Sequence, residues 1–165
     1  MATQQYDVKS IHMNASGLAV PFRTRLKGFN LFANSATAAQ SYAYDTESVA
    51  ATYTRTLTTV TVTYANHGLW TNKWVYLDFT AGTPAPAADG LYQVTVTDLN
   101  TFTITTVASG SISAGVVTAY MNVMLMVDTT SIASPSLLIP GEGILARSGI
   151  QLALAANHTI TIYYG

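Results

Sequence analysis

Two stretches of alternating residues decide the fold of this chain, Thr59-Val60-Thr61-Val62-Thr63 and Gln93-Val94-Thr95-Val96-Thr97. Alternation with a period of two turns one set of side chains inward and the other outward, as in a β-strand with one buried face. The turn signals Asn66-His67-Gly68 and Asp89-Gly90 interrupt the alternation. The middle of the chain is therefore predicted to be a small β module.

The segments that flank this module also have strand character, but each is too short to enclose a core alone. We therefore predict an all-β protein in which a small β-barrel, residues 51–121, is inserted between two parts of an outer domain. The outer domain, residues 1–50 and 122–165, is predicted to be a discontinuous, jelly-roll-like β-sandwich. Such an insertion costs little free energy, because the entropy of closing a loop grows only with the logarithm of its length.

The remaining strands follow from β-branched and aromatic enrichment between Gly, Pro and Asn turn signals. The segment Ser35–Gln40 is rich in alanine, but one isolated helical turn is marginal in water, so a loop is predicted there. The predicted strands are Tyr6–Met13, Thr24–Ala33, Ser41–Asp45, Thr58–Tyr64, Lys73–Phe79, Leu91–Thr97, Thr101–Val107, Val116–Val127, Ser136–Ile139, Ile150–Ala155 and Thr159–Tyr164.

Composition narrows the possible partners. Only 9% of the 165 residues are charged and the net charge is -1, whereas about a quarter of a soluble globular domain is charged. Binding to nucleic acid or to an anionic membrane requires clustered Lys and Arg, so neither partner is predicted. The chain has no cysteine and therefore neither disulfides nor thiolate chemistry.

The chain has one basic cluster, formed by Arg23, Arg25 and Lys27. Strand alternation puts the three cations on one face. A solvated or partner-facing side of a strand explains this pattern better than a phosphate site does. We keep all three residues as candidate partner contacts.

Trp70 and Trp74 are the candidate residues for binding a glycan. They are four residues apart around a predicted turn, so the two rings could stack on a sugar or on a neighbouring subunit. As members of a small barrel with little core, they fit the role of its partly buried plug better. The sequence leaves both interpretations open.

Catalytic and metal-binding patterns are not found. His12, His67 and His158 are far apart, and no serine lies in a Gly-x-Ser-x-Gly motif. His67 is interpreted as a turn residue and His158 as a loop residue before the last strand. There is no His-x-x-x-His pair and no calcium-loop pattern, so we predict a protein without enzymatic activity, metal or cofactor.

The ordered run from Thr59 to Ile104 resembles the small β-barrel repeat named for the first catalytic cysteine half-domain of ubiquitin-activating enzymes. That repeat recurs as an insert in phage virion proteins, and no ubiquitin chemistry follows here, because cysteine is absent. The flanks, with Ile139-Pro140-Gly141-Glu142-Gly143-Ile144 and the Tyr163-Tyr164-Gly165 end, are similar to small structural proteins of short-tailed phages of aquatic bacteria.

This resemblance implies a place in a virus particle. The leading expectation is a capsid decoration or cement protein on the head exterior, with the major capsid protein or other virion proteins as partners. The alternatives are a tail or fibre component that contacts the host surface, and a carbohydrate-binding module. We expect a homo-oligomer, with a trimer as the guess. Met1–Asp7 lacks the features of a signal peptide, so we expect assembly in the host cytoplasm.

Overall fold

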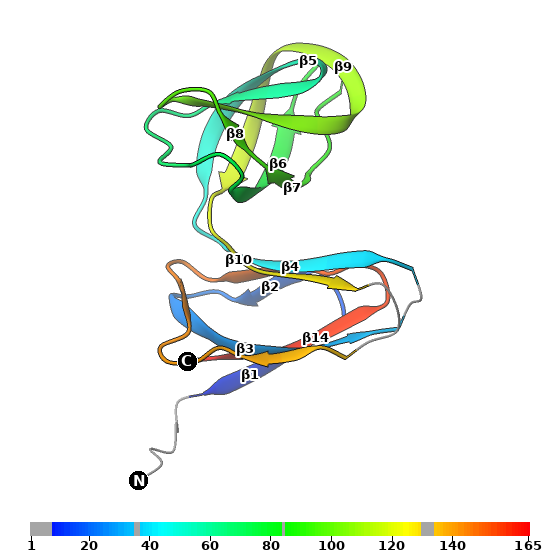
Figure 1. Ribbon diagram of the computed structural model, residues 1–165, viewed down its shortest axis with the longest axis vertical. Helices are drawn as coiled ribbons and strands as arrows, with labels where there is room; N and C mark the ends of the chain where they lie inside the picture. The colour runs from blue at the N-terminus through cyan, green and yellow to red at the C-terminus, as the bar shows by residue number, and fades with distance from the viewer. Residues whose placement is uncertain (1–7, 35–36, 84, 130–133) are drawn as a thin grey trace. The chain divides into compact units, whose positions relative to one another are not determined.

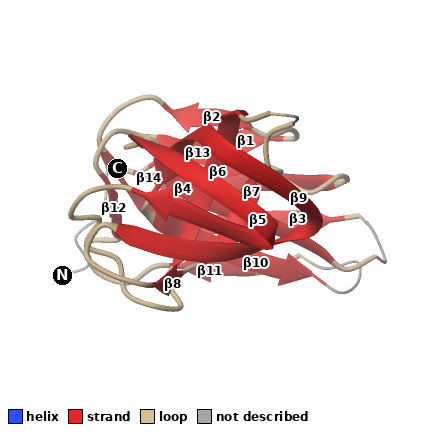
Figure 2. Ribbon diagram, turned by 90° about the horizontal axis from the view of Figure 1, so that it is seen from above, coloured by secondary structure: helices blue, strands red, loops and turns tan. Residues whose placement is uncertain are grey.

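The computed structural model describes residues 8–34, 37–83, 85–129 and 134–165, which form strands and loops without a helix (Figure 2). The prediction of an all-β fold is therefore confirmed. In the predicted loop Ser35–Gln40, residues 35 and 36 lie outside the described part. The last two residues of that segment begin the strand β4 (Ala39–Asp45).

The chain divides into two compact units. Met1–Glu47 and Met124–Gly165 form the outer unit, and Ser48–Val123 forms the inserted unit. The predicted boundaries, after residues 50 and 121, fall within a few residues of this division. Each unit has its own hydrophobic core.

The outer unit consists of two antiparallel sheets (Figure 1). The β3 sheet has the strand order β1-β14-β3-β11, and β12 pairs with β3 beside β11. Its strands are β1 (Lys9–Met13), β14 (His158–Tyr164), β3 (Thr24–Ala33), β11 (Ser136–Leu138) and β12 (Ile144–Ala146). The β4 sheet has the order β10-β4-β13-β2, from β10 (Val123–Thr129), β4, β13 (Ile150–Ala153) and β2 (Gly17–Val20).

Both sheets of the outer unit combine strands from the two ends of the chain. β14 lies between β1 and β3, and β13 lies between β2 and β4. Neither end can therefore build a sheet alone. The two sheets share one core, as expected for a β-sandwich, and its largest fully buried side chains include Leu26, Leu31, Ile150, Leu152 and Ile162.

Two strands were not predicted, the predicted strands Leu91–Thr97 and Val116–Val127 each cover parts of two strands, and the single strand Thr101–Tyr120 was predicted as two. β2 and β12 were not predicted, because runs of three or four residues carry almost no periodic signal. The predicted strand Val116–Val127 is two strands, with a break at Met121 and Asn122. The break lies where the chain passes from the inserted unit to the outer unit.

The inserted unit has the strand order β5-β9-β6-β7, and β8 also pairs with β9. Its strands are β5 (Val49–Thr63), β9 (Thr101–Tyr120), β6 (Trp74–Ala81), β7 (Gly90–Gln93) and β8 (Thr95–Val96). β5 and β9 are the longest strands and pair from end to end. The predicted alternation is present, because Val60 and Val62 are fully buried.

No sheet of the described residues closes into a barrel, so the predicted barrel is wrong. A closed barrel needs one uninterrupted ladder around its circumference. β7 and β8 are only four and two residues long. Between them, the N–H of Val94 donates to Lys73 O and its C=O accepts from Asn72 N, in the loop before β6.

The inserted unit covers its core by bending the β5–β9 pair. The register shifts at Leu57, which has a positive φ of 56°, a costly conformation for a residue with a bulky side chain. Arg55 stabilises the bend, because its guanidinium donates hydrogen bonds to the carbonyl oxygens of Leu57 and Ala108. Arg55 is only 7% exposed, so these bonds lie largely out of water.

Tyr53 is the largest fully buried side chain of the inserted unit. Its hydroxyl accepts a hydrogen bond from Ala87 N at 3.2 Å, and its ring meets Phe79 edge to face at a centroid distance of 4.8 Å. The ring has room only because residue 115 is glycine. A Cβ atom on Gly115 would overlap the ring of Tyr53.

We predict that Gly115→Ala lowers the free energy of unfolding by about 1 to 3 kcal/mol, because the added methyl group overpacks the core. Gly90→Ala is the matched control, since its Cβ would meet its nearest neighbour at an ordinary 3.7 Å. The control is expected to change stability by less than about 0.5 kcal/mol. Urea unfolding measures both values, and equal effects of the two substitutions would contradict the packing argument.

Candidate functional site

The outward side of the β3 sheet carries a row of neutral hydrogen-bonding side chains. The strand register aligns His12 with Thr161, Thr161 with Asn30, and Asn30 with Ser136, across four neighbouring strands. His12 Nδ1 lies 3.0 Å from Thr161 Oγ1. Asn30 and Ser136 are exposed to solvent, so they can bind a partner without breaking an internal contact.

A second row, of mixed aromatic and apolar character, runs beside the first. The register aligns Ser10 with Tyr163, Tyr163 with Gly28, and Gly28 with Leu138. Further along the same side of the sheet, Phe32 is paired with Thr159. Neither row contains Asp, Glu, Lys or Arg. We call the set the uncharged face: Ser10, His12, Gly28, Asn30, Phe32, Ser136, Leu138, Thr159, Thr161 and Tyr163.

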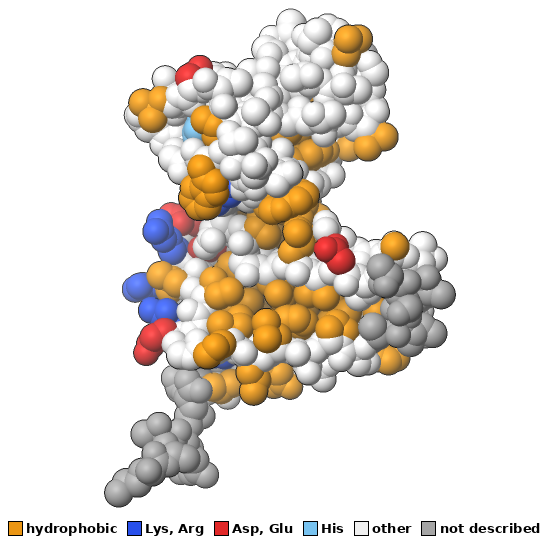
Figure 3. Space-filling model, in the orientation of Figure 1, with side chains coloured by type: hydrophobic (Ala, Val, Ile, Leu, Met, Phe, Trp, Pro, Cys, Tyr) orange, Lys and Arg blue, Asp and Glu red, His pale blue; other side chains and the backbone are white. Residues whose placement is uncertain are grey.

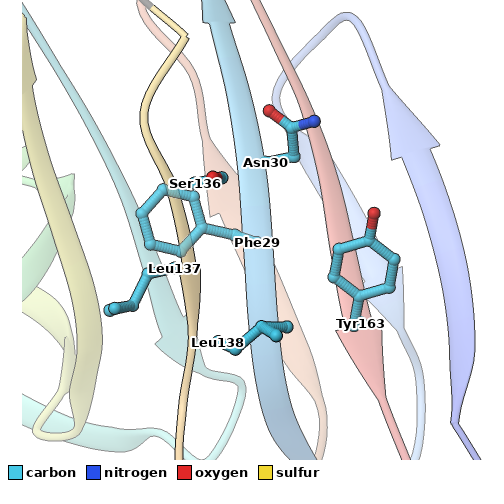
Figure 4. A pocket seen from close by; sticks show the side chains of 6 residues that line it. All are labelled: Phe29, Asn30, Ser136, Leu137, Leu138 and Tyr163. Atoms are coloured by element: carbon cyan, nitrogen blue, oxygen red, sulfur yellow. The ribbon is translucent and has the colours of Figure 1, made fainter.

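The uncharged face contains a hollow of about 270 Å³ beside β11. Figure 4 shows Leu138 reaching from β11 across β3, with Tyr163 beyond β3 and Asn30 further along it. Glycine at position 28 is required here, because a Cβ atom would lie 2.6 Å from Leu137 O and 3.1 Å from Leu138 Cδ2. The hollow is lined by the side chains of Tyr163, Phe29, Asn30, Ser136, Leu137 and Leu138.

β11 forms one edge of the β3 sheet, and all three of its residues are exposed. Leu31 N donates to Pro135 O at 2.9 Å, and Ile139 N donates to Lys27 O at 2.8 Å. Residues of an antiparallel strand alternate in the direction of their backbone hydrogen bonds. The N–H and C=O groups of Ser136 and Leu138 therefore point away from β3, where the described residues provide no neighbouring strand.

The predicted basic cluster lies at one end of the outer unit, where acidic residues accompany it. Arg25 Nε lies 3.7 Å from Glu142 Oε2, and Arg25 Nη1 donates to Gly143 O at 3.5 Å. Arg23 is exposed and Lys27 is half-buried. Most of the Lys and Arg side chains of this unit gather at its left end in the face seen in Figure 3. These basic side chains therefore lie at this end of the outer unit and not on the uncharged face.

The two candidate tryptophans have different environments. Trp70 lies in the loop before β6 and is 64% exposed, with Lys73 Nζ 4.6 Å from the centroid of its ring. Burial lowers the pKa of Lys73. Trp74 begins β6, is half-buried and is paired with Gln93. Among the described residues, no direct ring contact joins Trp70 and Trp74.

His158 takes part in a buried hydrogen-bond chain that the sequence did not reveal. Ser41 Oγ lies 2.7 Å from His158 Nδ1, and Thr129 Oγ1 lies 3.1 Å from His158 Nε2. The Thr129 hydroxyl donates to Ala39 O and Ser41 Oγ accepts from Ala155 N, which assigns the ring proton to Nε2. Both Ser41 and His158 are 1% exposed, so this Ser–His pair has a structural role and no access to a substrate.

His67 has a similar local role in the inserted unit. Its Nδ1 accepts from Leu69 N at 3.0 Å, and its Nε2 donates to Asp98 O at 2.9 Å. Asp98 Oδ1 in turn accepts from the backbone N–H groups of Asn100 and Thr101. These bonds, with the Thr101 hydroxyl as the main contributor, lower the pKa of Asp98. The ring of His67 therefore connects two turns.

The carboxylate of Asp45 accepts four backbone hydrogen bonds and is fully buried at the end of β4. Its Oδ2 accepts from Arg147 N at 2.6 Å, and its Oδ1 accepts from the N–H groups of Glu47, Ser148 and Gly149 at 3.1, 3.0 and 3.4 Å. Burial by itself raises the pKa of Asp45, but the four donors stabilise the charged form more strongly. The pKa therefore lies below its ordinary value of 3.8.

Metal ligands, membrane-spanning helices and similarity to known proteins give no further indication of the function. No group of three or more His, Asp or Glu side chains in the described residues is placed to hold a metal ion. The same part of the chain contains no helix long and apolar enough to cross a membrane. No known family model matches the sequence, and no curated protein matches it significantly.

We predict that Asp45→Asn lowers the free energy of unfolding by about 2 to 3 kcal/mol at pH 7, because hydrogen bonds to a charged acceptor are lost. Asp128→Asn is the control, since Asp128 is exposed and accepts a bond from Gln40 Nε2. The control is expected to cost less than about 1 kcal/mol. Urea unfolding of the three proteins gives the comparison.

The same carboxylate predicts a pH dependence. Its pKa is lower in the folded chain than in the unfolded chain, so its contribution is complete above the ordinary value of 3.8. The contribution is lost as the pH falls through the folded pKa, because the unfolded state then binds more protons. Unfolding measured between neutral pH and pH values below 3.8 should show a smaller loss in Asp45→Asn than in the wild type. An unchanged pH profile in the variant would argue against this role.

Proposed function

We propose that this chain is a non-enzymatic structural protein of a phage virion, a decoration protein that binds the exterior of the capsid. The observation that carries the proposal is the uncharged face of the β3 sheet. The centres of protein interfaces are poor in charged residues and rich in aromatic residues. The uncharged face has the same character, because it includes Tyr163 and Phe32. The sequence resemblance of the flanking segments to small tailed-phage proteins supports the same assignment.

The low cost of removing its neutral groups from water favours the uncharged face as the docking surface. Burying a charge without a partner is expensive, whereas neutral hydroxyl and amide groups need only one hydrogen-bond partner each. Asn30 and Ser136 provide such groups, and Leu138 and Phe32 provide exposed apolar area, with exposed fractions of 77% and 48%. A stable contact of the expected kind buries at least about 1,000 Å², which a broad sheet face can supply. The major capsid protein is the proposed partner.

The test combines purified protein with expanded capsids of the phage that encodes it. Wild-type protein is expected to co-sediment with the capsids and to appear in virions by mass spectrometry. Asn30→Lys places a charge in the centre of the uncharged face and should weaken co-sedimentation at least about tenfold. Ser111→Lys is the matched control, because Ser111 is an exposed strand residue of the inserted unit, and its binding should equal that of the wild type.

Absence of the protein from both capsid pellets and virions would refute the virion assignment. Electron microscopy of particles that lack the protein distinguishes its place in the particle. Smooth or fragile heads support decoration, whereas missing appendages support the alternative of a tail or fibre component. Equal co-sedimentation of Asn30→Lys and wild type would move the docking surface away from the β3 sheet.

The exposed ring of Trp70 favours a second candidate function, the binding of a neutral glycan. At 64% exposure the ring can stack on a sugar, and Lys73 lies over it. A glycan array probed with wild type and Trp70→Ala tests this function. Binding that disappears in the variant supports it, and an array that is blank for the wild type dismisses it.

A further inference from the structure

We propose that the free edge of the β3 sheet pairs with the same edge of a second copy of this chain. In this arrangement two β11 strands lie antiparallel about a two-fold axis, and the two β3 sheets become one continuous sheet. The inference rests on the geometry of β11 and holds whether or not the protein binds a capsid. It names the partner as this chain itself and the contact as Ser136–Leu138.

The edge formed by β11 has backbone groups available for another strand. A strand edge with unpaired backbone groups is a template for another strand, and natural proteins protect such edges with charges, prolines or very short strands. β11 is short and lies between Pro135 and Pro140, but it has no charge to repel a second strand, because the segment from Ser134 to Gly141 contains no charged residue. Its two leucines are 52% and 77% exposed. The backbone groups of Ser136 and Leu138 point to this open side.

The edge formed by β11 is complementary to itself. With Leu137 on the two-fold axis, Ser136 lies opposite Leu138 of the second copy, and Leu138 lies opposite Ser136. These are the two residues whose N–H and C=O groups are directed outward, so each pair can exchange both of its hydrogen bonds. A two-fold contact requires this kind of self-matching surface, because every residue meets its counterpart by symmetry.

The side chain at the two-fold axis is apolar. Leu137 is paired with Phe29, a buried core residue, so Leu137 lies on the core side of the sheet, although half of it is exposed. Two-fold symmetry brings Leu137 next to its own copy, which buries apolar surface on both sides. Identical charges at this position would repel each other, and the sequence places none there.

The length of the strand predicts a weak association. Three residues pair on each side, and Pro140 has no N–H to extend the ladder at the next outward-facing position. The contact is therefore smaller than a standard interface of about 1,600 Å². Such a pair forms readily where the chain is concentrated, as on a capsid surface, where the two uncharged faces would lie on the same side of the joined sheet.

Sedimentation equilibrium of the purified protein tests the proposal without any capsid. At loading concentrations from about 10 µM to about 1 mM, the wild type should pass from monomer to dimer, as expected for an interface below the standard size. Leu137→Lys and Leu137→Glu should each raise the dissociation constant at least about tenfold, because like charges then meet at the axis. An equimolar mixture of the two variants should restore the dimer, since opposite charges then face each other.

Leu18→Lys is the matched control. Leu18 is 51% exposed and lies in β2, the edge strand of the β4 sheet, so this variant should dimerise like the wild type. Ser136→Pro is a second variant that removes an N–H pointing away from β3, and it should also abolish the dimer. Circular dichroism and thermal melting verify that each variant is folded.

Several results would overturn the pairing. A wild type that stays monomeric over the whole concentration range refutes it, and so does a trimer, the state guessed from the sequence. Folded Leu137 variants that fail to combine in the mixture exclude Leu137 from the axis. Loss of the dimer in Leu18→Lys but not in the Leu137 variants would move the contact to β2. None of these outcomes depends on capsid binding, which is measured separately.

Discussion

The fold of the outer unit depends on one constraint. Its two chain segments are separated in sequence by the inserted unit, and they must pair with each other to form both sheets. Asp45 satisfies this constraint where the first segment ends. Its buried carboxylate accepts the backbone N–H groups of Arg147, Ser148 and Gly149, which connect β12 to β13. The chain leaves the outer unit two residues later, after Glu47. A single charged side chain thus connects the end of the first segment, just before the inserted unit begins, to the C-terminal segment of the sandwich.

The distribution of charge links this architecture to the proposed function. The chain has few charged residues, and several in the outer unit are placed in structural contacts such as those of Asp45, Arg25 with Glu142, and Arg147 with Glu47. The uncharged face of the β3 sheet is left with hydroxyl, amide, imidazole, aromatic and aliphatic groups. Such a surface can be buried against a protein without desolvating ions, which is the main energetic cost of a polar interface.

The inserted unit shows where residue patterns lose their predictive value. Alternation of Thr and Val placed Val60 and Val62 in the core, as the structure has them. It did not show that β5 and β9 bend at Leu57, that Arg55 supports the bend, or that the ladder is interrupted at Val94. These features depend on backbone conformation and on hydrogen bonds between residues far apart in sequence. The sequence therefore predicted strands in the inserted unit, but these strands do not close into the predicted barrel.

The sequence by itself determined the all-β class and the burial of Val60 and Val62 in β5, because alternation and β-branched residues act locally. Singling out the candidate residues relied on residue type and local spacing and gave no indication of their neighbours in space. These residues are Arg23, Arg25, Lys27, Trp70 and Trp74. Only the tertiary structure decided that Asn30 lies between Thr161 and Ser136, that Ser41 meets His158, and that β11 forms an edge. These contacts join residues more than 100 positions apart, and strand order, which no local pattern encodes, brings them together.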